Sequence, residues 1–117
     1  ESIPLWSSQR RLSEPKRRAL REQRLSNNPL GLANSLRGAG TGAQQCLHNQ
    51  LSNLKIPCLF LAGEDDTKFV ELAREMKDSI PGAQLTIIPK AGHTIHMEQP
   101  KLFNSSVLSF LRTHAKL

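Results

Sequence analysis

The stretch Ile56-Pro57-Cys58-Leu59-Phe60-Leu61-Ala62-Gly63-Glu64-Asp65-Asp66 carries the strongest structural signal in the chain. Its first seven residues form a short, continuous apolar run, which is typical of a β-strand buried on both faces of a sheet. Pro57 is acceptable because it stands at the start of the run, where its missing N–H disturbs a sheet least. A glycine and three acidic residues follow, so the strand is expected to end in a polar loop.

Beyond this stretch, helices and strands are predicted to alternate. An amphipathic helix is expected over residues 68–79, a second strand over 84–88, a loop over 89–99, and a last helix from Pro100. Strands that alternate with helices indicate an α/β fold with a parallel sheet. The apolar positions that define the first of these helices are Phe69, Leu72, Ala73, Met76 and Ile80.

The length of the chain and its predicted topology lead to different expectations about whether it forms a complete domain. The chain has 117 residues, which is enough for one domain. Two parallel strands, however, need further strands and helices to bury their faces and edges. We therefore expect the chain to be the carboxyl-terminal piece of a larger α/β domain, or one subunit of a split one.

The first half of the chain is predicted to be helical after a polar lead-in over residues 1–12. A first helix is expected from a cap at Ser13 to about Ser26, where an Asn-Asn-Pro sequence ends it. Shorter helices are expected over residues 30–36 and 43–51, separated by a glycine-rich break.

Composition excludes several classes of protein. Hydrophobic residues make up 38% of the chain and charged residues 22%, which is typical of globular rather than disordered proteins. No apolar run approaches the ~20 residues of a membrane span. Cys46 and Cys58 lack the number and spacing of a disulfide scaffold or a metal site. No membrane partner and no metal are therefore expected.

Positive charge is concentrated near the amino terminus. The net charge is +6, from 16 Lys and Arg residues against 10 Asp and Glu residues. Nucleic-acid binding is not expected, because no aromatic residues interleave the basic cluster and no known nucleic-acid motif is present. The cluster is interpreted as a solvated helix face or, through one or two arginines, as a site for an anionic small molecule. Its members are Arg10, Arg11, Lys16, Arg17, Arg18, Arg21 and Arg24.

Two polar loops are expected at the same edge of the sheet, because the carboxyl ends of parallel strands meet there. One loop contains Glu64, Asp65 and Asp66, and the other contains His93. A carboxylate that accepts a hydrogen bond from one imidazole nitrogen fixes the tautomer and leaves the other nitrogen to move a proton. The pattern indicates half of a general-base or nucleophilic site. At least one of the other two acids is expected only to favour the N-terminus of the next helix.

A nucleophile that would complete such a site is missing from the sequence. The G-x-S-x-G motif of α/β-hydrolases occurs nowhere among the 117 residues. The glycine-rich segment 38–42 lacks a central serine, the lysine of a P-loop and the strand that precedes a dinucleotide motif. In α/β-hydrolases the chain order is Ser, acid, His, so an acid and a histidine without the serine are what a carboxyl-terminal half would carry.

Several motifs match known family patterns. Residues 63–69 fit a pattern G-E-x-D-x-K-F, residues 91–100 contain an A-G-H motif, and residues 24–29 and 35–44 are also similar. With these motifs the chain resembles the last part of the α/β-hydrolase superfamily. More narrowly, it resembles the family of 2-succinyl-6-hydroxy-2,4-cyclohexadiene-1-carboxylate synthases of menaquinone and phylloquinone biosynthesis. The resemblance covers nearly the whole chain, and the A-G-H motif alone marks only the superfamily.

The resemblance implies a fold and a reaction. The chain would be the carboxyl-terminal portion of an α/β-hydrolase fold, with residues 1–53 as a helical lid segment and residues 54–117 as the βαβα part of the core. The family eliminates pyruvate from 2-succinyl-5-enolpyruvyl-6-hydroxy-3-cyclohexene-1-carboxylate to give 2-succinyl-6-hydroxy-2,4-cyclohexadiene-1-carboxylate. The family uses a Ser-His-Asp triad for this lyase reaction and needs no metal or organic cofactor.

The resemblance also implies roles for individual residues. Asp66 would orient His93, and His93 would pair with the serine and support proton removal. Arg24 stands where the family places a substrate-binding arginine, and a guanidinium suits a small polycarboxylate substrate because it binds carboxylates bidentately. The serine and the oxyanion-hole loop would come from an amino-terminal half, in the same or a separate chain. Without this partner the isolated chain is expected to be inactive.

Two other interpretations stay open. The chain could belong to another α/β-hydrolase, such as an esterase or a C–C hydrolase, although a pocket for an apolar ester has no need of Arg24. It could also be a non-catalytic remnant or an interaction module, although the presence of both Asp66 and His93 argues against this. The expected compartment is the cytoplasm in a bacterium, or a plastid or other organelle in a eukaryote.

Overall fold

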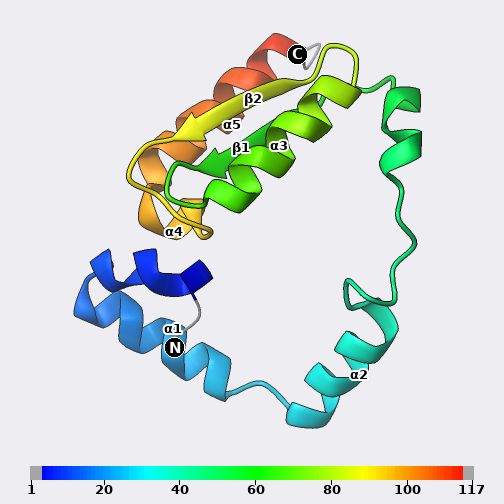
Figure 1. The fold of residues 1–117 in the computed structure, drawn as a ribbon. Helices are drawn as coiled ribbons and strands as arrows, with labels where there is room; N and C mark the ends of the chain where they lie inside the picture. Colours follow the sequence, from blue (N-terminus) through cyan, green and yellow to red (C-terminus); the bar gives the residue numbers. More distant parts are fainter. Residues whose placement is uncertain (1–3, 115–117) are drawn as a thin grey trace.

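The computed structural model describes residues 4–114. Two 3-10 helices, five α-helices and two strands are found among these residues (Figure 1). In chain order they are the 3-10 helix Pro4–Arg11, α1 (Glu14–Leu25), α2 (Pro29–Ala39), the 3-10 helix His48–Asn53, β1 (Leu59–Gly63), α3 (Thr67–Ser79), β2 (Gln84–Ile88), α4 (Ile95–Glu98) and α5 (Pro100–His114).

The two strands are parallel neighbours, which confirms the predicted α/β arrangement. Their register pairs Leu59 with Gln84 at one end and Gly63 with Ile88 at the other. The first strand begins at Leu59, later than the apolar run that starts at Ile56. Pro57 has no N–H to donate to a neighbouring strand, so regular pairing begins only beyond it.

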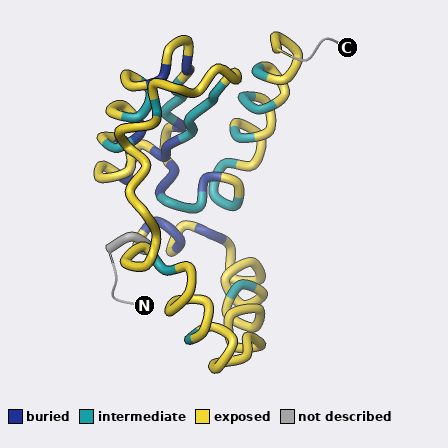
Figure 2. Tube along the Cα trace, turned by 90° about the vertical axis from the view of Figure 1, so that its right-hand side faces the viewer, coloured by how far each residue is buried: buried dark blue, intermediate teal, exposed yellow. Residues whose placement is uncertain are grey.

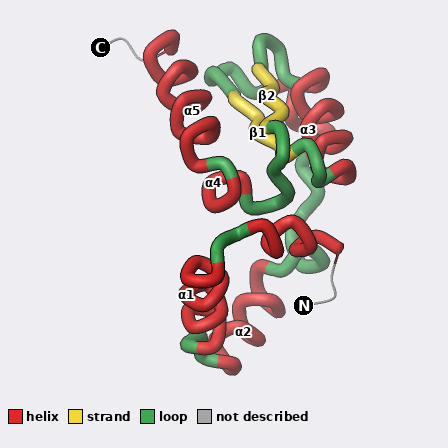
Figure 3. The backbone as a smooth tube through the Cα atoms, turned by 90° about the vertical axis from the view of Figure 1, so that its left-hand side faces the viewer, coloured by secondary structure: helices red, strands yellow, loops and turns green. Residues whose placement is uncertain are grey.

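Helices cover both faces of the sheet, with α3 on one side and α5 on the other (Figure 3). On the α3 side, Ala62 of β1 packs with two buried helix residues, Val70 and Ala73. On the α5 side, Ile88 packs with Ala91 and with the neighbouring helices. Successive residues of each strand therefore serve two small cores, as the alternation of side chains in a strand requires.

The expectation of a fully buried strand is wrong. Residues 59–61 of β1 are only half-buried, and no large side chain among the described residues is fully buried. The reason is the width of the sheet, since two strands offer little surface for α3 and α5 to cover. The predicted inner face of α3 also differs at one position, because Val70 is buried whereas Phe69 is 38% exposed.

The helices of the first half differ from the prediction in length and number. The first, α1, forms over the expected residues, but the expected cap is not made, because Ser13 has no side-chain capping hydrogen bond. Helix α2 extends to Ala39, and Asn28 caps its N-terminus by accepting a hydrogen bond at Oδ1 from the N–H of Gly31 at 3.0 Å. The predicted helix over residues 43–51 is wrong, because the only helix here is the 3-10 helix His48–Asn53. A short helix needs tertiary packing to be stable, and Leu47, one of its two apolar anchors, is 52% exposed.

The polar lead-in is a structured element rather than a simple extension. The 3-10 helix Pro4–Arg11 packs against α4, and Ser8, Gln9 and Leu12 are buried (Figure 2). The loop expected over residues 89–99 likewise contains a helical turn, α4. The start of the chain therefore lies against the histidine-bearing loop that follows β2.

The chain as a whole is open. Its radius of gyration is 16.6 Å, whereas a compact domain of this length has a radius of about 13 Å. Helix α2 contributes no buried residue, and Figure 2 shows this segment exposed over most of its length. Within residues 4–114, no helix has the length and apolar character required to cross a membrane.

Candidate active site

The carboxylate of Asp66 and the imidazole of His93 are in direct contact. Asp66 lies at the N-terminus of α3, but its side chain makes no capping hydrogen bond there. Instead its Oδ2 atom is 2.7 Å from Nδ1 of His93. The Asp66 side chain is 8% exposed and that of His93 is 31% exposed. The structure thus brings together the two residues that the sequence placed at the ends of neighbouring strands.

The two loops that carry this pair are joined through their backbones. Beyond the strands, the N–H of Glu64 donates to the carbonyl of Ile88, and the N–H of Asp65 donates to the carbonyl of Ala91, each at 2.9 Å. Gly63 permits this close approach, because a Cβ atom there would lie 2.2 Å from the carbonyl oxygen of Gly92. These contacts hold the acid loop and the histidine loop at a fixed separation.

The two other acids of the first loop have separate partners. Glu64 accepts a hydrogen bond from the N–H of Lys90 at 3.1 Å, and Asp65 forms an ion pair with Arg11. The hydrogen bond to Asp65 raises the pKa of Arg11 above its ordinary value. Both acids therefore tie the loop to its surroundings, which is a more specific role than a general effect on the helix N-terminus.

Two aromatic rings lie against the imidazole of His93. The ring of Phe69 is 4.6 Å away, centroid to centroid, at an angle of 59°, and the ring of Trp6 is 5.4 Å away at 80°. Sequence reasoning missed both roles, since Phe69 was assigned to the core and Trp6 to a polar lead-in. The available signals were that Trp6 is the only tryptophan and that Phe69 belongs to a family motif.

Arg24 also contacts this aromatic group, through Trp6. Its guanidinium carbon is 5.1 Å from the centroid of the Trp6 ring, a cation–π contact. Its NH2 group also donates to Oε1 of Gln9 at 3.1 Å. The three residues singled out from the sequence are therefore connected through one indole. The ring of Trp6 contacts His93, which is bonded to Asp66, and it also contacts Arg24.

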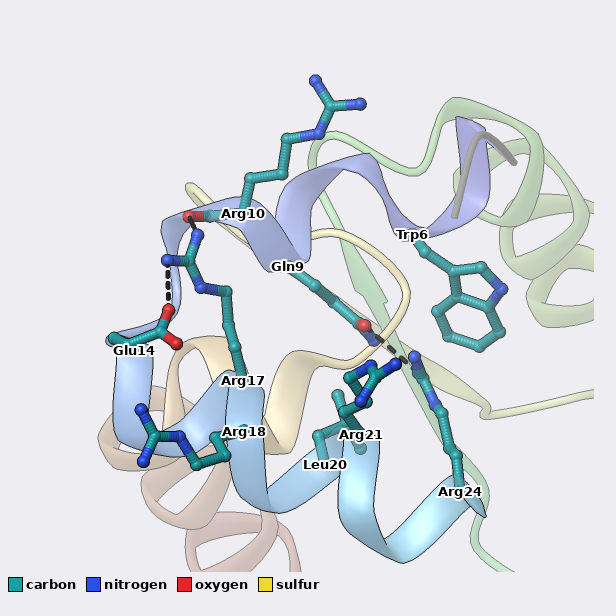
Figure 4. A pocket seen from close by; sticks show the side chains of 9 residues that line it. All are labelled: Trp6, Gln9, Arg10, Glu14, Arg17, Arg18, Leu20, Arg21 and Arg24. Carbon is teal, nitrogen blue, oxygen red and sulfur yellow. Dashed lines mark hydrogen bonds and ion pairs between the residues drawn. The ribbon is translucent and has the colours of Figure 1, made fainter.

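A basic pocket of about 520 Å³ opens between α1 and the 3-10 helix Pro4–Arg11 (Figure 4). The side chain of Arg17 is held by Glu14 at 2.7 Å and by the backbone oxygen of Arg10 at 3.3 Å. Positive charge so close to the histidine attracts anions. The pocket is lined by Trp6, Gln9, Arg10, Glu14, Arg17, Arg18, Leu20, Arg21 and Arg24.

Glu98, in the loop expected over residues 89–99, is a buried carboxylate that bonds within that loop. Its side chain is 2% exposed. Burial alone would raise the pKa of Glu98, but hydrogen bonds from Gly92, Thr94 and Ser8 outweigh this effect and lower the pKa below its ordinary value. Glu98 is therefore held as a carboxylate anion beneath the histidine loop.

The remaining histidines lie apart from the Asp66–His93 pair. His96 stacks edge-on with Phe103 at 6.0 Å, and His48 and His114 are exposed. Among residues 4–114, no cluster of three or more His, Cys, Asp or Glu side chains could hold a metal ion. The described site contains an imidazole bonded to a carboxylate, and the guanidinium of Arg24 lies over the tryptophan that contacts this imidazole.

Known proteins match most of this chain. No protein-family model matches it. A putative 2-succinyl-6-hydroxy-2,4-cyclohexadiene-1-carboxylate synthase of Bacillus subtilis (strain 168) is 48% identical over 111 residues, which are 95% of this chain and 40% of that protein. The synthase of Serratia proteamaculans (strain 568) is 37% identical over 100 residues, 86% of this chain and 37% of that protein.

Solved structures give the same result. MenH from S. aureus superposes with a TM-score of 0.95 and 40% identity, over 97% of this chain and 43% of that one. Est816, described as an N-acyl homoserine lactone degrading enzyme, superposes with a TM-score of 0.67 and 29% identity, over 84% of this chain and 40% of that one. The chain thus spans about two fifths of the length of these relatives. It has the fold of the carboxyl-terminal part of an α/β-hydrolase, and within that superfamily it resembles the 2-succinyl-6-hydroxy-2,4-cyclohexadiene-1-carboxylate synthases.

Proposed function

We propose that this chain supplies the acid and the histidine of a pyruvate-eliminating lyase. The substrate would be 2-succinyl-5-enolpyruvyl-6-hydroxy-3-cyclohexene-1-carboxylate, and the product 2-succinyl-6-hydroxy-2,4-cyclohexadiene-1-carboxylate. The observation that carries the proposal is the 2.7 Å contact between His93 and Asp66, in a chain that is 48% identical to a putative synthase of this reaction.

The geometry suits proton removal by a serine–histidine system. Asp66 holds Nδ1 of His93, so Nε2 is the atom that receives a proton from the serine of the amino-terminal half. The activated oxygen takes a proton from ring carbon C2 of the substrate, and the electrons of that C–H bond form the C2=C3 double bond. The existing C3=C4 double bond shifts to C4=C5, the C–O bond between C5 and the enolpyruvyl group breaks, and pyruvate leaves after gaining a proton. Asp66 stabilises the imidazolium that forms in between.

Arg24 would anchor the substrate through one of its carboxylates. It lies over the same indole that contacts His93, so a carboxylate bound there is close to the base. A guanidinium with free N–H groups binds a carboxylate bidentately. The remaining arginines of the basic pocket would raise the local concentration of the anionic substrate.

The amino-terminal half would be the partner that completes the site. Residues 1–53 would form a lid-type segment and residues 54–117 the carboxyl-terminal part of the core, in line with the similarity to about two fifths of each relative. The open shape and the exposed apolar residues support such a partner, because a large apolar surface is rarely left exposed. Leucines and isoleucines that are at least half exposed include Leu25, Leu30, Leu32, Leu36, Leu47 and Ile56. The chain by itself would be inactive.

A chimeric protein tests the proposal. In it, this chain replaces the matching carboxyl-terminal segment of the Bacillus subtilis relative, and pyruvate release is followed with lactate dehydrogenase and NADH. Release that depends on the added chain is the expected result. The likeness to Est816 favours a hydrolase as the second candidate, so the same protein is assayed with a p-nitrophenyl ester and an acyl homoserine lactone. Hydrolysis without pyruvate release would favour that candidate, and a folded chimera inactive in every assay would favour a non-catalytic role.

A further inference from the structure

The carboxylate of Glu98 binds the backbone on both sides of His93. Its Oε2 atom accepts a hydrogen bond from the N–H of Gly92 at 3.0 Å, and its Oε1 atom accepts from the N–H of Thr94 at 3.4 Å. Gly92 and Thr94 are the immediate neighbours of His93, so Glu98 fixes the position of the peptide segment that carries the imidazole.

The same carboxylate binds the 3-10 helix Pro4–Arg11, about 90 residues away in sequence. Oε1 accepts a hydrogen bond from the hydroxyl of Ser8 at 2.9 Å, and Oε2 pairs with the guanidinium of Arg11 at 3.4 Å. The packing here is close, because a Cβ atom on Gly92 would lie 2.1 Å from the Ser8 hydroxyl. Glu98 thus connects the histidine loop to the segment that carries Trp6.

A chain of hydrogen bonds continues from Glu98 to Arg24. The hydroxyl of Thr94 donates to Oε1 of Glu98 at 2.8 Å and accepts from Nε2 of Gln9 at 3.1 Å. The other end of the Gln9 amide, Oε1, accepts from Arg24 at 3.1 Å. Gln9 is buried, so water competes little for these bonds. One network therefore joins the base and the arginine that would hold the substrate.

We propose that Glu98 is a positioning residue that clamps the Trp6 segment onto the histidine loop and so fixes the distance between His93 and Arg24. This role rests on the proposed function only in taking His93 as the base. Glu98 itself is not a catalytic residue, since it is almost completely buried and its oxygens are occupied by five donors. A buried carboxylate that loses its charge leaves such donors unsatisfied, which releases the segments it joins.

The fluorescence of Trp6 gives a direct readout of the clamp. Trp6 is the only tryptophan of the chain, and its ring touches that of His93. An indole held against neighbouring side chains is shielded from a quencher dissolved in water. Acrylamide should therefore quench the emission of the 117-residue chain more weakly than that of free N-acetyltryptophanamide.

The decisive comparison is between Glu98→Gln and Glu64→Gln. In Glu98→Gln the acrylamide quenching of Trp6 should rise at least twofold and the emission should shift to the red, because the amide cannot accept bonds at both ends. Glu64→Gln is the matched control, since Glu64 binds the same loop through Lys90 and has no bond to the Trp6 segment. Quenching that is unchanged in Glu98→Gln would overturn the proposal. If the circular dichroism of Glu98→Gln shows loss of fold, Ser8→Ala decides, with increased acrylamide quenching in support and unchanged quenching against.

The chimeric enzyme separates this proposal from the proposed function. There, Glu98→Gln should lower kcat/KM for pyruvate release at least tenfold, while Glu64→Gln lowers it less than threefold. A chimera that releases no pyruvate in any form would remove the proposed function, yet the quenching result would still decide whether Glu98 clamps Trp6 to His93. Normal pyruvate release by Glu98→Gln would overturn the clamp and leave the proposed function intact.

Discussion

The Nδ1 atom of His93 lies 2.7 Å from Oδ2 of Asp66, although 27 residues separate them in sequence. The contact exists because β1 and β2 are parallel neighbours whose carboxyl ends open at the same edge. The Asp66 side chain is 8% exposed, so its charge is little screened by water. A carboxylate in this position sets the tautomer of the imidazole and stabilises its protonated form.

The first prediction concerns the charge of this carboxylate. Asp66→Asn keeps the size of the side chain but cannot stabilise the imidazolium, so kcat for pyruvate release in the chimeric enzyme should fall by about 10²–10⁴-fold. Asp65→Asn is the matched control, because Asp65 pairs with Arg11 rather than with His93. Steady-state kinetics check both variants, and similar losses in the two would contradict the role assigned to Asp66.

The second prediction concerns Arg24. Hydrogen bonds to charged groups contribute about 1.5–3 kcal/mol each, and about 1.4 kcal/mol corresponds to a factor of ten. Arg24→Ala should therefore lower kcat/KM of the chimeric enzyme by about 10–100-fold. Arg112→Ala serves as the control, since Arg112 is exposed near the end of α5 and does not line the basic pocket. An Arg24→Ala enzyme with unchanged kinetics would remove this residue from the site.

The third prediction concerns pH and the stability of the chain. The pKa of Glu98 is lower in the folded chain than its ordinary value of about 4.3 in an unfolded chain. Its contribution to the free energy of unfolding is therefore fully present above that ordinary value and is lost as the pH falls through the lowered one. Thermal unfolding followed by circular dichroism should show Tm falling more steeply below pH 4.5 in the wild type than in Glu98→Gln. Parallel curves for the two proteins would contradict this.

The sequence predicted the parts of the fold that depend on local pattern. The periodicity of apolar residues predicted helix α3, and β-branched residues predicted strand β2. The Asp66–His93 contact was predicted because the carboxyl ends of neighbouring parallel strands lie at the same edge of a sheet. The helix over residues 43–51 was wrong because periodicity alone does not stabilise a short helix. Two leucines at helical spacing meant little without a surface to pack against.

The sequence could not reveal how the start of the chain completes the site. The 3-10 helix Pro4–Arg11 has no clear apolar period, and its decisive contacts, Ser8 with Glu98 and Gln9 with Thr94, join residues 90 and 85 positions apart. Contacts at such separations depend on how the elements pack, which no local window of sequence contains. The sequence therefore could not predict that Trp6 contacts His93.

The most direct test of the central claim compares pyruvate release by the chimeric enzyme with and without His93. The account predicts steady release by the unsubstituted chimera and a loss of at least about 10³-fold in kcat for His93→Ala, because the imidazole is the group that moves the proton. His96→Ala, at the histidine that stacks on Phe103, should retain activity within a few fold. A His93→Ala chimera that still releases pyruvate at the unsubstituted rate would contradict the assignment of the Asp66–His93 pair as half of the catalytic site.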